Sequence, residues 1–98
     1  MTNGAYEIRY AAAAVDDLRG MRAFNQREIL DGIELHLRYG PTFVSRSRIK
    51  AMAQPFQSQY RLRIGDFRVY YDVDDVGRVV NVLRILTKKT TQTREDWP

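Results

Sequence analysis

The stretch YRLRIGDFRVYYDV, residues 60–73, decides much of the fold, because its pattern is that of two strands joined by a tight turn. Gly65-Asp66 is a two-residue loop of the Gly-X kind, which favours a type II′ turn and fixes the register of the two strands. In that register six apolar or aromatic residues share one face, which we expect to pack against helices: Tyr60, Leu62, Ile64, Phe67, Val69 and Tyr71.

The opposite face of this hairpin is basic. It pairs Arg63 with Arg68 and Arg61 with Tyr70. Like charges placed directly opposite each other destabilise a sheet by a few tenths of a kcal/mol or more, roughly. A structural role does not explain that choice, so we expect an anion to bind there. The alternative is a set of solvent-facing arginines with no binding role.

The basic residues of the whole chain are concentrated in its second half. Residues 1–43 contain five basic and six acidic residues, whereas residues 44–89 contain ten basic and four acidic residues. The net charge of +4 therefore comes from the second half of the chain. Such segregation favours an acidic or polyanionic partner.

Length and composition predict one soluble domain. The chain has 98 residues, of which 44% are hydrophobic and 29% charged, and it has no cysteine. Neither a signal peptide nor a membrane span is evident, so we expect a cytoplasmic protein with a single domain over residues 1–98. His36 is the sole histidine, and we expect no metal site and no cofactor.

Residues 6–40 have the pattern of a strand followed by two helices. Alternation predicts a strand at residues 6–10, and the alanine-rich run after it favours a helix that ends near Gly20. Asp16-Asp17 is most simply a favourable interaction with a helix start. Asn25 with Glu28 resembles a capping box with Phe24 as its hydrophobic staple, and Gly40-Pro41 ends this second helix.

The segment at residues 42–58 is irregular in pattern and has Arg46, Arg48 and Lys50 at a spacing of two. If this part is extended, the three side chains point the same way. Binding to RNA phosphates and a solvated charged loop are both compatible with that spacing.

A last strand is predicted at residues 79–86. A five-residue loop at 74–78 places Leu83 and Ile85 in the core and Arg84 opposite Arg68, whereas a four-residue loop turns Arg84 toward the core. We prefer the first because it avoids burying a charge. The expected fold class is thus α+β: an N-terminal strand, a helical hairpin and an antiparallel β-meander whose outer face is basic.

These residues carry a resemblance to a known family. YRLRIGDFRVYYDV followed by VVNVLRI resembles the hairpin and last strand of the RelE/ParE superfamily, the toxins of type II toxin–antitoxin modules. GPTFVSRSRIKAM is similar to the segment before the hairpin in one subgroup, and the RelE-like branch matches better. The resemblance covers most of the chain and implies the compact fold of these toxins.

In the RelE branch, the resemblance implies an endoribonuclease that cuts ribosome-bound mRNA without a metal, by attack of a ribose 2′-hydroxyl. By position, Arg61, Arg63, Arg68 and Lys89 match basic residues that act at the phosphate. The remaining cations near this face are expected to bind RNA: Arg46, Arg48, Lys50, Arg84 and Lys88.

The tail TTQTREDWP departs from the RelE pattern because it has no tyrosine for proton transfer. Tyr70, on the same face as Arg61, is the residue that can take this role. Two further functions stay open: a ParE-like inhibitor of DNA gyrase, and a toxin fold without catalytic activity that acts as a binding module. All three imply an acidic antitoxin as the partner.

Overall fold

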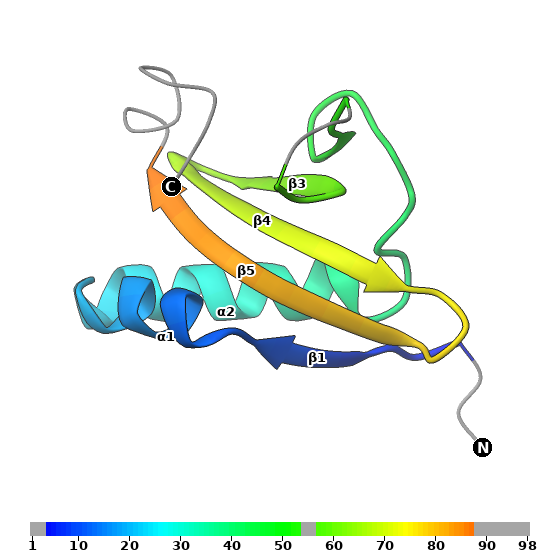
Figure 1. Cartoon of the computed structure of the whole chain (residues 1–98). Helices are drawn as coiled ribbons and strands as arrows, with labels where there is room; N and C mark the ends of the chain where they lie inside the picture. The colour runs from blue at the N-terminus through cyan, green and yellow to red at the C-terminus, as the bar shows by residue number, and fades with distance from the viewer. Residues whose placement is uncertain (1–3, 54–56, 88–98) are drawn as a thin grey trace.

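The computed structural model describes residues 4–53 and 57–87 and has five strands and two helices in this part (Figure 1). In chain order they are β1 (Glu7–Tyr10), α1 (Ala12–Arg19), α2 (Ala23–Leu37), β2 (Ile49–Ala51), β3 (Tyr60–Ile64), β4 (Phe67–Asp74) and β5 (Val79–Thr87). The order of strand, two helices and a β-meander confirms the expected α+β class.

The strands form one mixed sheet in the order β1-β5-β4-β3-β2. β1 pairs in parallel with β5, and the other neighbours are antiparallel. Both helices lie on one side of this sheet (Figure 1), which leaves the other side of β2, β3 and β4 uncovered by helices.

The register of the β3–β4 hairpin is the predicted one. Ile64 pairs with Phe67, Arg63 with Arg68, and Arg61 with Tyr70. Gly65 has φ +56° and Asp66 has no positive φ, as a type II′ turn requires at its first central position. The turn therefore places the apolar and the basic residues on opposite faces, as expected from the sequence.

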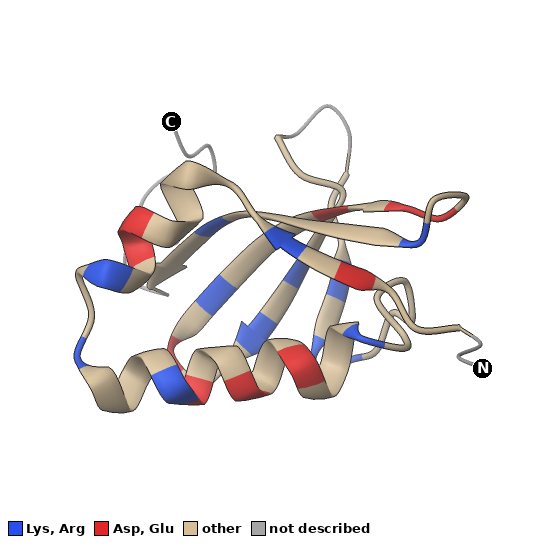
Figure 2. Cartoon of the chain, turned by 90° about the horizontal axis from the view of Figure 1, so that it is seen from below, with Lys and Arg blue, Asp and Glu red and all other residues tan. Residues whose placement is uncertain are grey.

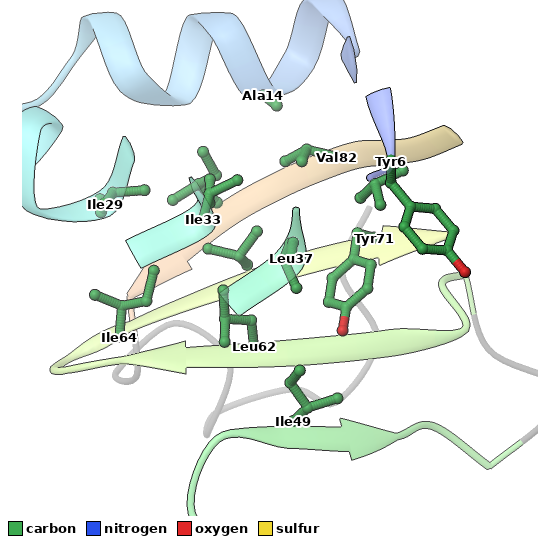
Figure 3. Close-up of a cluster of buried hydrophobic side chains, with 13 residues drawn as sticks. Tyr6, Ala14, Ile29, Ile33, Leu37, Ile49, Leu62, Ile64, Tyr71 and Val82 are labelled. Atoms are coloured by element: carbon green, nitrogen blue, oxygen red, sulfur yellow. The ribbon is translucent and has the colours of Figure 1, made fainter. Parts of the chain in front are cut away.

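The core lies between the helices and the inner face of the sheet (Figure 3). Ile29, Ile33 and Leu37 of α2 are fully buried, and Leu62, Val69 and Tyr71 meet them from β3 and β4. The Tyr71 hydroxyl donates a hydrogen bond of 2.6 Å to the Pro41 carbonyl oxygen. This bond satisfies the one polar atom of a side chain that is otherwise buried among apolar groups.

The predicted start of the second helix is wrong. α2 begins at Ala23 with Arg22 as its N-cap residue, and no side chain caps it. Asn25 lies inside the first turn, and Phe24 is 77% exposed rather than packed as a staple. The helix is anchored by its buried stripe of isoleucine and leucine, so its stability does not depend on a capping box.

The predicted loop between β4 and β5 is also wrong. Asp74 pairs with Val79, so the loop has four residues, and a bulge at Tyr70/Tyr71 then shifts the register by one. Arg84 consequently lies opposite Tyr70, not Arg68. Val82 and Ile85 enter the core while Leu83 is half-buried. The bulge, not the loop, keeps Arg84 out of the core.

α1 is fixed to the sheet by Asp17, which lies in the last turn of the helix and not at its start as we predicted. Its carboxylate accepts hydrogen bonds from Arg84 Nε at 2.8 Å and from the Ile85 backbone N–H at 2.8 Å. Asp17 thus pairs a half-buried cation and satisfies a backbone donor of β5. Among the described residues, no helix has the length and apolar character needed to span a membrane.

Candidate functional site

A recess of about 370 Å³ opens on the side of the sheet away from the helices. We call it the cationic recess. Six of its ten lining residues are basic and come from β2, β3, β4 and the loop before β2: Arg46, Arg48, Lys50, Arg61, Arg63 and Arg68. Val44, Ser45, Ser47 and Ile49 complete its wall, so no carboxylate of the described residues lines it.

Pairing of β2 with β3 brings the two predicted groups of cations together. Lys50 lies opposite Arg61, and the Arg63 N–H donates to the Arg48 carbonyl oxygen at 2.9 Å. β2, a short strand in the segment with an irregular sequence pattern, therefore joins Arg46, Arg48 and Lys50 to the hairpin. Figure 2 shows the resulting bands of basic residues across the strands, with acidic residues prominent on α2.

Ser45 and Arg48 hold the loop that forms the outer wall. The Ser45 Oγ accepts hydrogen bonds from the backbone N–H groups of Arg48 at 3.1 Å and Ile49 at 3.3 Å. Arg48 Nη1 donates to the Arg63 carbonyl oxygen at 3.0 Å. The only signal in the sequence for this fixed loop is Ser45 itself, a residue type that is typical of tight turns.

The cations of this recess, like Arg22, Arg27 and Arg78, lack the carboxylate partners among the described residues that the four other described arginines have. Elsewhere in the described ranges, Arg9, Arg19, Arg38 and Arg84 each pair with an aspartate or glutamate. Within the same ranges, none of the six recess cations pairs with a carboxylate. Six like charges without counter-ions are mutually repulsive, and an anion bound among them would relieve that repulsion.

Arg68 is the most enclosed of these cations, with 9% of its surface exposed. Its Nη1 donates to the carbonyl oxygens of Gly65 and Phe67, each at 3.0 Å. Burial lowers the pKa of the Arg68 guanidinium, and the neighbouring charges of Arg61 and Arg63 lower it further. Arginine nevertheless keeps its charge in proteins, so Arg68 is a fixed positive charge at the floor of the recess.

The other predicted site residues do not all meet here. Tyr70 lies opposite Arg61 in the register, and 3% of its surface is exposed. Arg84 is not brought to the recess, because its guanidinium is bound to Asp17. Lys88 and Lys89 lie outside the described residues.

His36 does not line the cationic recess. His36 is half-buried on α2, and its pKa is lowered by burial and by the charge of Arg48. In the part of the chain that the structure describes, no three side chains of histidine, aspartate or glutamate are grouped so as to hold a metal ion. What the recess offers is therefore a set of arginine and lysine donors, suited to phosphate oxygens.

Comparison with known protein families gives one match. Residues 8–91 match the family described as the ParE toxin of the type II toxin–antitoxin system parDE. The matched residues make up most of the chain and include every strand and helix except the first residue of β1. A comparison with curated proteins gives no match.

Solved structures with a similar fold include toxin–antitoxin complexes and an isolated toxin. The RelBE2 complex from Mycobacterium tuberculosis has a TM-score of 0.72 at 21% identity, covering 85% of this chain and 98% of that chain. The RelE–RelB complex from Pyrococcus horikoshii has a TM-score of 0.70 at 22% identity, covering 86% and 96%. The isolated RelE toxin of E. coli has a TM-score of 0.63 at 13% identity, covering 91% and 98%.

Proposed function

The chain belongs to the ParE toxin family of type II toxin–antitoxin systems, and we propose that this toxin acts as an mRNA interferase. In this proposal it cuts ribosome-bound mRNA without a metal ion. The observation that carries the proposal is the cationic recess, where six basic side chains converge and none pairs with a carboxylate in the part of the chain that the structure describes. A protein that acted only through apolar contacts would have no need of this arrangement.

The proposed reaction is an internal transfer at one phosphate. The ribose 2′-oxygen attacks the adjacent phosphorus, a P–O2′ bond forms and the P–O5′ bond breaks. The proton of the 2′-hydroxyl passes to a base, and the departing 5′-oxygen takes a proton from an acid. The products are a 2′,3′-cyclic phosphate and a 5′-hydroxyl end. Negative charge grows on the phosphate oxygens in the transition state, where Arg61, Arg63 and Arg68 would stabilise it.

Tyr70 is our candidate for proton transfer, because its strand register places it opposite Arg61. With 3% of its surface exposed, the phenol would have to become accessible when RNA binds. The Tyr70→Phe variant tests this assignment through the pH profile of the cleavage rate. Loss of one limb of that profile supports a proton-transfer role, while an unchanged profile rules it out.

The test of the proposed function is induction of the toxin without its antitoxin, followed by mapping of mRNA 5′ ends on translating ribosomes. Single changes of Arg61 or Arg63 to alanine should reduce cleavage by about 10²–10³-fold, as for other positioned donors. Arg27→Ala, on the exposed surface of α2, is the matched control. The proposal is wrong if cleavage is absent, or if it persists when Arg61, Arg63 and Arg68 are all alanine.

Inhibition of DNA gyrase is the second candidate, favoured by the match to the ParE family and by the lack of a tail tyrosine. A supercoiling assay with purified gyrase separates the two. Inhibition at micromolar toxin, together with intact mRNA in the induction experiment, would favour this function over cleavage.

We also propose an acidic antitoxin as the partner. The support is that the M. tuberculosis and P. horikoshii structures are complexes with RelB-type antitoxins. The exposed cations of the recess would attract such a partner and be neutralised by it. Co-expression with the product of the adjacent reading frame, followed by native mass measurement, tests whether a stable complex forms.

A further inference from the structure

A second recess of about 300 Å³ adjoins the cationic recess at the turn between β3 and β4. We call it the turn recess, and it is lined by Ser47, Arg48, Arg63 and Gly65. The first three of these residues also line the cationic recess. The two hollows are therefore neighbours, with the same two arginines on the boundary between them.

The turn recess has the donors that a phosphate needs. Arg48 uses Nη1 on the Arg63 carbonyl oxygen, which fixes the guanidinium between the hollows and leaves its other N–H groups available. Arg63 and Ser47 are exposed, and neither makes a side-chain hydrogen bond to another described residue. Two guanidinium groups and a hydroxyl can each donate to phosphate oxygens.

The surroundings limit this subsite on one side. Glu28 reaches the turn from α2, and its Oε2 lies 3.5 Å from the position that a Cβ would take on Gly65. It does not line the turn recess. Arg63, beside Ser47, therefore attracts an anion into this recess, and Glu28 on α2 repels it.

We propose that the turn recess is a second phosphate subsite, so that the protein holds two successive phosphates of one RNA strand. The strand then runs from Lys50 and Arg61 toward the tip of the β3–β4 hairpin. This inference rests on the proposed function for the identity of the ligand as RNA. It adds the path of the strand and assigns to Arg48 and Arg63 a contact with both phosphates.

Binding of short 2′-O-methyl oligonucleotides tests the second subsite without cleavage, because the methyl group blocks the attacking oxygen. One probe is a trinucleotide with two phosphodiester linkages. The matched probes have the same bases, with either linkage replaced by a neutral methylphosphonate. We expect the second charged phosphate to tighten binding by about tenfold or more, as for a charged hydrogen-bonded contact. It should also steepen the dependence of log K on log salt by about 0.7.

Two variants of Ser47 test this gain. Ser47 borders both recesses, so Ser47→Asp should weaken every probe, and it should also abolish the advantage of the second charged phosphate, which a change in the cationic recess alone should not do. Ser47→Asn, which has nearly the same shape without the charge, should keep this advantage. Arg46→Gln, in the cationic recess alone, should weaken all the probes by a similar factor and also keep the advantage. Circular dichroism of each variant checks that the exposed substitution leaves the fold intact.

The outcomes separate this inference from the proposed function. The second subsite is wrong if the second charged phosphate does not tighten binding to the natural protein, or if it tightens binding equally in Ser47→Asp. It is also wrong if no probe binds. If the gain behaves as expected while ribosome mapping finds no cleavage, the subsite stands and the interferase proposal is wrong.

Discussion

Arg63 and Arg68 lie directly opposite each other on neighbouring strands, and neither pairs with a carboxylate among the described residues. Arg68 is enclosed, and its pKa is lowered by burial and by its cationic neighbours. Opposed like charges destabilise a strand pair, so this arrangement lowers the stability of the fold. This cost is consistent with the proposed binding of an anion at these arginines.

We expect Arg63→Gln to stabilise the fold while weakening function. The free energy of unfolding should rise by a few tenths of a kcal/mol, up to about 1 kcal/mol, at low salt. Urea denaturation at 10 mM and at 1 M salt measures this change, which should vanish at high salt because the charges are then screened. Arg27→Gln, on the acidic α2, should give no such increase. A loss of stability in Arg63→Gln at low salt would contradict the interpretation.

The buried hydroxyl of Tyr71 makes the stability of the fold depend on pH. Burial raises the pKa of the Tyr71 phenol far above its ordinary value of 10. The unfolded chain therefore releases this proton first, and the stability contributed by the neutral phenol is lost as pH rises above 10.

Tyr71→Phe should lower the free energy of unfolding by about 1–2 kcal/mol at pH 7, because the Pro41 carbonyl oxygen loses its donor. Above pH 10 the difference from the natural protein should shrink, since phenylalanine cannot ionise in the unfolded chain. Denaturant titrations from pH 7 to 11 measure this difference in the free energy of unfolding. A difference that stays constant or widens would show that Tyr71 ionises as easily in the folded protein.

At the scale of elements, the features that can be predicted from the sequence are those set by residues close together in the chain. The β3–β4 register follows from one two-residue loop, and the arginines that face outward follow from the register. The basic surface of the hairpin was therefore predictable. The recess was not, because it also needs β2, a three-residue strand whose pairing depends on distant contacts.

Three expectations are wrong: the start of α2, the register of β5 and the role of Asp17. α2 is anchored by burial of Ile29 and Ile33, and it begins at Ala23, before the local capping pattern at Asn25. The register of β5 is decided by a bulge opposite Tyr70, and strand alternation contains no signal for an inserted residue. Asp17 was missed as a link to Arg84 because the two are far apart in sequence.

α1 depends on Asp17 for its attachment to β5. Asp17→Asn keeps one acceptor but removes the charge that pairs with Arg84, whose side chain is 22% exposed. We expect a loss of about 1.5–3 kcal/mol, the range for hydrogen bonds to charged groups, in thermal or urea unfolding. The neighbouring Asp16→Asn is the control, since its pair with Arg19 is exposed and should have no measurable effect. Equal effects of the two changes would contradict this role.

Gly32 lets α2 approach β3 closely. A Cβ on Gly32 would lie 2.6 Å from Cδ1 and 3.1 Å from Cγ1 of Ile64, a buried residue. Gly32→Ala should gain up to about 1 kcal/mol of helix propensity and lose about 1–3 kcal/mol to overpacking, for a net destabilisation.

Ile64→Val removes the nearest methyl group and provides the test of that clash. In a double-mutant cycle, Gly32→Ala should cost less, or stabilise, when residue 64 is valine. Urea unfolding of the four proteins measures the coupling. Additive effects would show that the alanine methyl is accommodated without contact with Ile64.

At the scale of the whole molecule, one core connects the two ends of the described chain. β1 is parallel to β5 and hydrogen-bonded to it, and β5 in turn pairs with β4 at the centre of the sheet. Tyr6 near the start and Ile85 near the end belong to the same buried cluster. The cationic recess is built on the outer side of this same sheet, so its geometry depends on the integrity of the whole fold.

We therefore expect the chain to unfold as a single cooperative unit. Calorimetry should give one transition whose calorimetric enthalpy equals the van't Hoff enthalpy. Deletion of residues 1–10 removes β1 and exposes Val80 and Val82, which are fully buried, so it should abolish the transition instead of lowering it locally. A deletion of residues 1–3, which precede the described chain, is the control and should leave the transition in place. Two separate transitions, or a folded core that survives the larger deletion, would show that the helices and the meander are independent and that the recess does not need β1.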